Sequence, residues 1–192
     1  MDSTKNEPTQ DPNPFLRYYK NGKLQRPIGT PFVPPSNDPE TGVISKDIII
    51  SHEPKIAARL YRPTTTTKLP LLIYIHGGAF SIESAFSTLY HTHLNTLTAA
   101  ACVIAVSIEY RLAPEHLIPS CYEDCWEAIK WVEQASDPWI KNQADLNRVF
   151  LAGDSAGGNI AHNIAVRAGL TIPAQPGPGL KIAGMALVHP YF

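Results

Sequence analysis

"RVFLAGDSAGGN", residues 148–159, joins two kinds of sequence pattern at one point. Residues 148–153 are mostly apolar, which is typical of a strand buried on both faces of a sheet. Residues 155–169 then have the apolar spacing of a helix, which we expect Gly169 to end. Ser155 therefore lies where a strand turns into a helix, in the G-x-S-x-G pattern of a nucleophile elbow.

Ser155 is the candidate nucleophile of the chain. A serine hydroxyl reacts at neutral pH only when a base accepts its proton and an acid orients that base. The glycines around Ser155 allow the tight turn that exposes its oxygen at the helix N-terminus. The alternative is a serine that only caps the helix, with glycines that permit close packing. The position directly after a strand favours the catalytic interpretation.

The rest of the chain repeats the alternation of strand and helix. Further buried strands are predicted at residues 71–76, 102–108 and 181–189. A helix is predicted over residues 87–101, and a second one where Ser120 and Glu123 form an S-x-x-E capping box. This order predicts an α/β fold with a mainly parallel sheet.

The N-terminal part of the chain has extended rather than helical patterns. Residues 47–51 and 56–62 predict an antiparallel pair of strands. Asn21-Gly22 predicts a tight hairpin, with a helical turn before it as the alternative. Residues 1–14 are polar and rich in proline, so we expect them to be disordered. Residues 15–192 are expected to form a single domain, with a peripheral segment at 15–46 and the sheet core at 47–192.

A glycine-rich loop, "HGGAF" at residues 76–80, follows the predicted strand at 71–76. Two glycines let the backbone turn its N–H groups outward. Those of Gly78 and Ala79, with that of Ala156 after the candidate nucleophile, are placed to bind an oxyanion. The alternative is a plain glycine turn before a helix. Because both glycine motifs stand at strand ends, coincidence is the weaker explanation.

Composition narrows the class of partner. The formal net charge is −1, with 16 basic and 17 acidic residues spread along the chain, which argues against nucleic acid and anionic membranes. We expect a small uncharged molecule as partner, without metal or cofactor. The three cysteines have no disulfide or zinc spacing, and the chain has no signal peptide or long apolar run. These features predict a cytoplasmic protein without a membrane span; the oligomeric state stays open.

Four motifs together resemble one family. "HGGAF", "YRLAPEH" (110–116), "GDSAGGN" (153–159) and "LVHPYF" (187–192), in this order, resemble plant carboxylesterases of the hormone-sensitive-lipase type. That group includes enzymes like 2-hydroxyisoflavanone dehydratase and the gibberellin receptors. The resemblance extends over nearly the whole chain from Pro14. It implies an α/β-hydrolase fold, a lid formed by residues 15–46, and hydrolysis of small acyl esters.

The resemblance also implies roles for single residues. Ser155 matches the nucleophile, and Gly77, Gly78 and Ala79 match the oxyanion loop, with Ala79 in place of a commoner third glycine. His76 matches a residue that anchors this loop. Outside the resemblance, Arg111 and Glu115 are close enough in sequence to form an ion pair or to brace the loop. An acyl pocket lined by aromatic side chains would use Phe15, Phe80 and Phe86.

The catalytic acid and base are not evident in this chain. In the α/β-hydrolase fold they follow the nucleophile in the order Asp or Glu, then His. The residues after Ser155 include no Asp or Glu, and their histidines are His162 and His189. His162 lies two helical turns beyond Ser155, about 10 Å along the axis, which is too far for a direct hydrogen bond. His189 ends the last predicted strand, and the resemblance gives it no role as base.

We therefore expect an N-terminal part of a serine esterase, without the last strands and helices of the fold and largely inactive by itself. Two alternatives remain open. One is a non-catalytic binding module of the gibberellin-receptor type, and the other is an enzyme of the hydroxyisoflavanone dehydratase branch.

Overall fold

The computed structural model describes residues 7–9, 15–65, 67–171 and 179–192. Its centre is a six-stranded sheet with the order β3-β4-β6-β5-β7-β8. The strands are β3 (Val43–His52), β4 (Lys55–Pro63), β5 (Leu69–Ile75), β6 (Ile104–Glu109), β7 (Ala144–Asp154) and β8 (Ile182–Val188). The strands β6, β5, β7 and β8 run parallel, whereas β3 and β4 pair antiparallel. The α/β class, the mainly parallel sheet and the antiparallel pair are confirmed.

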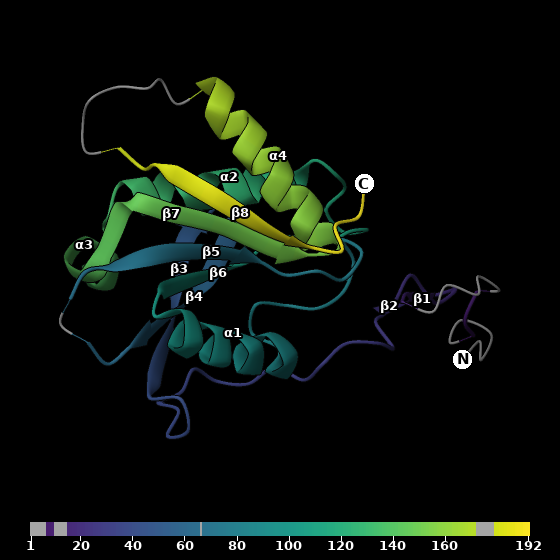
Figure 1. Ribbon diagram of the computed structural model, residues 1–192. Helices are drawn as coiled ribbons and strands as arrows, with labels where there is room; N and C mark the ends of the chain where they lie inside the picture. Colours follow the sequence, from purple (N-terminus) through teal and green to yellow (C-terminus); the bar gives the residue numbers. More distant parts are fainter. Residues whose placement is uncertain (1–6, 10–14, 66, 172–178) are drawn as a thin grey trace.

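Helices cover both faces of the sheet (Figure 1). Helix α1 (Thr88–Ala101) lies on one face, and α2 (Ser120–Glu133) and α4 (Ala156–Thr171) lie on the other. A short helix, α3 (Pro138–Gln143), was not predicted. Asp137 caps it, because its side chain accepts a hydrogen bond from the Trp139 N–H at 2.8 Å. An N-cap Asp followed by Pro at the first helical position is a signal that would have found it.

One predicted helix cap and one predicted helix end are wrong. Ser120 is the first residue of α2 and Pro119 precedes it as N-cap without any side-chain bond, so the capping box does not form. Glu123 instead pairs with Arg167 of α4 at 2.9 Å. Helix α4 continues through Gly169 to Thr171. A glycine inside a helix costs about 1 kcal/mol relative to alanine, which a packed helix tolerates.

The apolar strands explain the core. Alternate side chains of β5 point to opposite faces, so Ile73 packs on the α2 and α4 side while Leu72 packs on the α1 side with Leu94. Cys121 and Cys125 are buried on α2, as small apolar side chains should be. Burial raises the pKa of the Cys121 thiol to about 11, so the thiol stays protonated at neutral pH.

The N-terminal part forms the predicted hairpin of β1 (Arg17–Tyr18) and β2 (Leu24–Gln25), which stands away from the sheet (Figure 1). Most of the predicted disordered segment, residues 1–6 and 10–14, lies outside the described residues. The Thr9 N–H donates to the Tyr18 carbonyl oxygen at 2.8 Å. After the hairpin, residues 26–33, here called the N-terminal strap, run along residues 81–88.

The outer strand β8 has an open side. Within the described residues no further strand pairs with it, and Met185 and Val188 are 49% and 51% exposed. An apolar edge of this kind is a surface to which another strand can add.

Candidate active site

Ser155 lies in the turn between β7 and α4, at the carboxyl edge of the sheet. Its φ of 49° is left-handed, a conformation uncommon for residues other than glycine. Two backbone hydrogen bonds join it to residues 188–191: the Ser155 N–H donates to the Val188 carbonyl at 2.9 Å, and the Tyr191 N–H donates to the Ser155 carbonyl at 3.0 Å. Neighbouring segments thus stabilise a strained turn, which is typical of functional sites.

Gly157 allows the first turn of α4 to pack directly on the end of β5. A Cβ atom built at this position would collide with the carbonyl groups of Ile75 and His76. Only glycine fits so close an approach of two backbones. This packing brings the Ser155 turn beside the loop that starts at His76.

The loop at residues 76–80 has an unusual backbone. Gly78, Ala79 and Phe80 have φ values of 107°, 50° and 58°. Among the interactions of the described residues, none uses the N–H of Gly78 or of Ala79 as a donor. Ala156 is the first residue of α4, so its N–H has no carbonyl one turn earlier in the helix. All three N–H groups belong to the predicted oxyanion set, and their role as donors stays a prediction.

Gly77 differs from the other members of that set. Its N–H donates to the Tyr90 hydroxyl oxygen at 2.8 Å and to Asp154 Oδ1 at 3.1 Å. It is therefore already used inside the protein, and the prediction that Gly77 supplies an oxyanion donor is corrected. The physical reason is that β5 and β7 are neighbours, which places the Asp154 carboxylate against the start of the loop.

Half-buried Asp154 forms a hydrogen-bonded cluster with buried Tyr74 and Tyr90, which the sequence patterns did not predict. The Tyr74 hydroxyl donates to Asp154 Oδ1 at 3.1 Å, and the Tyr90 hydroxyl donates to Oδ2 at 2.9 Å. Burial, followed by the nearby Asp154 charge, raises the pKa of both phenols. Both hydroxyls therefore stay protonated and act as donors. The signal in the sequence was the carboxylate directly before the candidate nucleophile.

His76 anchors the loop, in agreement with the role implied by the resemblance. Its buried ring stacks on Tyr110 with centroids 4.3 Å apart, and Nδ1 lies 2.8 Å from the Gly77 carbonyl oxygen. Burial lowers the pKa of His76 to about 4, so the ring is neutral at pH 7 and Nδ1–H donates to Gly77. The Tyr110 hydroxyl in turn donates to the His76 carbonyl at 2.9 Å.

Glu109 binds residues 84–85, in the segment that follows the loop at residues 76–80. Its Oε2 accepts hydrogen bonds from the Ser84 hydroxyl and from the Ala85 N–H, each at 2.7 Å. Burial raises the pKa of the Glu109 carboxyl to about 7. The carboxyl group thus clamps residues 84–85 to the end of β6.

The predicted pair of Arg111 and Glu115 does not form. Arg111 instead binds Asp124, with Nη2 2.7 Å from Oδ1, and Glu115 binds Arg26 of the strap at 2.6 Å. Asp124 is buried on α2, and a buried carboxylate needs a charged partner. Proximity in sequence was therefore a poor guide to pairing.

None of the remaining candidates forms a hydrogen bond with the Ser155 hydroxyl within the described part of the chain, so their roles stay predictions. The His162 ring contacts Phe192 with centroids 5.2 Å apart. Phe80 contacts Tyr122 and Tyr191, whereas Phe86 lines a separate cavity. The assignment of Phe15 to the acyl pocket stays a prediction.

In the part of the chain that the structure describes, no group of three or more His, Cys, Asp or Glu side chains is arranged to hold a metal ion. None of the helices described is both long and apolar enough to cross a membrane.

The strand order, the serine in a strand-to-helix turn and the glycine loop after the neighbouring strand together define an α/β-hydrolase fold. A family model described as the alpha/beta hydrolase fold matches residues 72–192, and the chain belongs to this family. Within the family, the relatives support membership of the plant carboxylesterases of the hormone-sensitive-lipase type.

Two curated relatives illustrate this similarity. A 2-hydroxyisoflavanone dehydratase of Glycyrrhiza echinata is 50% identical over 99% of this chain and 61% of its own length. "Probable carboxylesterase 1" of Arabidopsis thaliana is 47% identical over 95% of this chain and 60% of its own length. The chain thus spans about 60% of the length of these relatives.

Solved structures show the same fold. A hyperthermophilic esterase from the archaeon Pyrobaculum calidifontis is 36% identical with a TM-score of 0.64, over 76% of this chain and 44% of that one. A thermostable carboxylesterase cloned from a metagenomic library is 29% identical with a TM-score of 0.65, over 85% of this chain and 49% of that one.

Proposed function

We propose that this chain carries the nucleophile and the oxyanion donors of a serine carboxylesterase that hydrolyses small acyl esters. Ser155 is the nucleophile, and the N–H groups of Gly78, Ala79 and Ala156 bind the oxyanion. The observation that carries the proposal is the left-handed Ser155 turn at the carboxyl edge of the sheet, hydrogen-bonded through the adjacent Asp154 to the loop of Gly78 and Ala79.

The proposed chemistry is acyl transfer in two steps. The Ser155 oxygen attacks the ester carbonyl carbon, its proton passes to a base, and the carbonyl electrons move to oxygen, where the backbone donors stabilise them. The tetrahedral intermediate then expels the alcohol, which takes up the proton. Water attacks the acyl-serine in the same way and releases the carboxylic acid.

The base and its orienting acid belong to the same proposal. In this fold both follow the nucleophile along the chain. Because the residues from 156 to 192 include no Asp or Glu, we propose that sequence outside these 192 residues supplies them. The chain alone should then retain only residual catalysis, of the kind that an oxyanion hole supports without a triad.

Hydrolysis of p-nitrophenyl acetate tests this proposal. The 192-residue chain should turn the ester over only slowly above buffer, and Ser155→Ala should leave that residual rate nearly unchanged, because it comes from the oxyanion donors. The nucleophile is tested by mass spectrometry of the protein after the reaction: an acetyl group should be found on Ser155 in the unmodified chain and in the control Ser136→Ala, at an exposed serine, and should be missing in Ser155→Ala. Equal acetylation of Ser155→Ala and the unmodified chain would contradict the nucleophile. Sustained turnover at the level of an intact esterase would contradict an external base.

A dehydratase activity is the second candidate, and it rests on the 50% identity to a 2-hydroxyisoflavanone dehydratase. The same backbone donors would then bind an oxygen of the substrate while water is eliminated. Formation of an isoflavone from a 2-hydroxyisoflavanone, followed by absorbance, distinguishes this reaction from ester hydrolysis.

A cytoplasmic location is part of the proposal. It rests on the three cysteines, which are free thiols, of which Cys102 is exposed. A thiol at the surface suits a reducing compartment. Fractionation of the source tissue with an antibody to this chain tests the location.

A further inference from the structure

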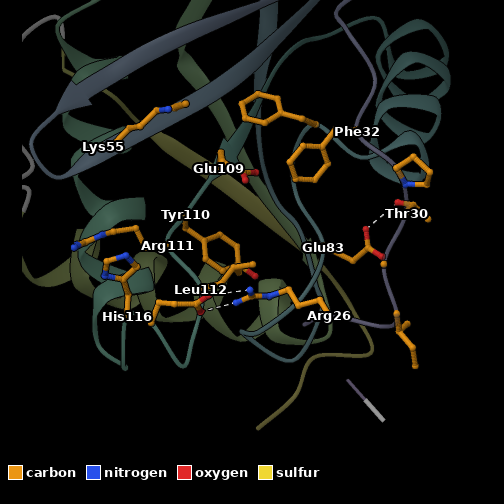
Figure 2. Close-up of a pocket in the computed structure, with 16 residues that line it drawn as sticks. Arg26, Thr30, Phe32, Lys55, Glu83, Glu109, Tyr110, Arg111, Leu112 and His116 are labelled. Atoms are coloured by element: carbon orange, nitrogen blue, oxygen red, sulfur yellow. Dashed lines mark hydrogen bonds and ion pairs between the residues drawn. The ribbon is translucent and has the colours of Figure 1, made fainter. Parts of the chain in front are cut away.

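A cavity of about 960 Å³ lies between the N-terminal strap and residues 109–116 (Figure 2). Cavities of up to about 1,000 Å³ hold small organic molecules. Ser155 and the loop of Gly78 and Ala79 are not among the residues that line it. The cavity is therefore distinct from the proposed ester site and needs an explanation of its own.

The walls of the cavity are largely apolar and partly aromatic. The side chains that supply this surface are Ile28, Pro31, Phe32, Phe86, Tyr110 and Leu112. Phe32 is 70% exposed, yet its backbone is fixed, because the Val33 N–H donates to the Phe86 carbonyl at 2.9 Å. An exposed ring on a fixed segment is a surface on which a flat apolar molecule can pack.

Glu109 provides a fixed acceptor inside this apolar surface. Its Oε2 is held by Ser84 and Ala85, whereas no interaction found among the described residues uses Oε1. Figure 2 shows the carboxyl group of Glu109 between the rings of Phe32 and Tyr110. The group is already ordered, so a ligand that donates a hydrogen bond to it need not arrange it first.

The charges around the cavity nearly cancel. Arg26 is paired with Glu115, and Arg111 is paired with Asp124. Glu83 accepts a hydrogen bond from Thr30 at 3.0 Å. Thr30 is uncharged, so Glu83 keeps its negative charge. Lys55, which has no ion pair among the described residues, adds one positive charge to the negative charges of Glu83 and Glu109. A strongly charged ligand therefore gains nothing from the site as a whole.

We propose that this cavity is a second small-molecule site, which binds an uncharged ring compound through one hydroxyl group. The hydroxyl donates to Glu109 Oε1, and the ring packs on Phe32 and the neighbouring apolar side chains. The site is independent of the ester chemistry proposed for Ser155.

Binding of 2-naphthol tests the proposal, with 2-methoxynaphthalene as the matched probe that lacks the donor. Isothermal titration of the 192-residue chain at pH 8, above the Glu109 pKa of about 7, should show 2-naphthol binding about tenfold more tightly, because a hydrogen bond to a charged group contributes that much. Phe32→Ala should weaken both probes, whereas Glu109→Gln should reduce only the preference for the hydroxyl.

Two further variants guard the test against misfolding and against binding elsewhere. Ala57→Leu fills the cavity from β4 and should abolish binding, while Ser155→Ala should bind as the unmodified chain does. Circular dichroism confirms the fold of each variant. Equal affinity for the two probes, or binding unchanged by Ala57→Leu, would overturn the proposal. Loss of binding in Ser155→Ala would place the probe in the ester site and overturn it as well.

Discussion

Asp154 Oδ1 lies 3.1 Å from the backbone nitrogen of Gly77, and this hydrogen bond joins the end of β7 to the end of β5. It connects the turn of the proposed nucleophile to the loop of the proposed oxyanion donors. Tyr90 completes the connection, because its hydroxyl both accepts from the Gly77 N–H and donates to the Asp154 carboxylate.

Removal of the Tyr90 hydroxyl should destabilise this connection. In Tyr90→Phe the Gly77 N–H and the Asp154 carboxylate each lose a partner, so the free energy of unfolding should fall by about 1–3 kcal/mol. Urea denaturation measures it. Tyr18→Phe, in the hairpin, is the control and should change stability little. Equal stability of the two variants would mean that the Tyr90 hydroxyl contributes nothing to the fold.

Two glycine-to-alanine changes in α4 should have opposite effects. Gly157→Ala places a methyl group against the carbonyls of Ile75 and His76 and should cost about 3 kcal/mol or more. Gly169→Ala meets no neighbouring atom and should stabilise the helix by about 0.5–1 kcal/mol. Thermal unfolding compares them, and a tolerated Gly157→Ala would contradict the close packing of α4 on β5.

His76 and Glu109 should give opposite dependences of stability on pH. The pKa of His76 falls to about 4 in the folded protein, so its contribution is present above pH 6.5 and is lost as the pH falls toward 4. The pKa of Glu109 rises to about 7, so its contribution is present below pH 4.5 and is lost as the pH rises toward 7. Between pH 4.5 and 6.5 the two effects oppose each other.

Glu109→Gln should expose the His76 effect. Without the titration of Glu109, stability should fall more steeply on acidification from pH 6.5 to 4.5 than in the unmodified chain. The two losses of stability should differ by on the order of 2 kcal/mol, because the pKa of Glu109 rises from 4.5 to about 7 on folding. Urea denaturation at several pH values measures the difference between the two proteins. Parallel profiles would show that Glu109 titrates normally.

Arg26 of the N-terminal strap should stabilise residues 77–87. Its Nε donates to the Ser81 carbonyl at 2.6 Å, while the guanidinium binds Glu115. In Arg26→Gln the amides of residues 77–87 should exchange hydrogen about tenfold faster, because charge-assisted bonds are lost. Arg17→Gln, at an exposed site in the hairpin, provides the comparison. Unchanged exchange in Arg26→Gln would show that the strap lies on the loop without holding it.

Local sequence patterns were sufficient for most of the elements, with α3 as an exception, and for the position of Ser155. Apolar runs predicted the four parallel strands, and the glycines around Ser155 predicted the turn that the structure shows. Both depend on residues that are neighbours in the chain. The end of α4 was wrong because packing on the sheet outweighs the preference of Gly169 to stop a helix.

The contacts between distant segments were decided only by the tertiary structure. The order of strands placed Asp154 beside Gly77, so the Gly77 N–H serves the fold rather than an oxyanion. Arg111 pairs with the buried Asp124 and not with Glu115, and Glu115 pairs with Arg26 of the strap. Sequence periodicity thus determined which residues are buried and where the chain turns. Which polar groups pair depends on their distance in space and on desolvation, and only the packed sheet sets these.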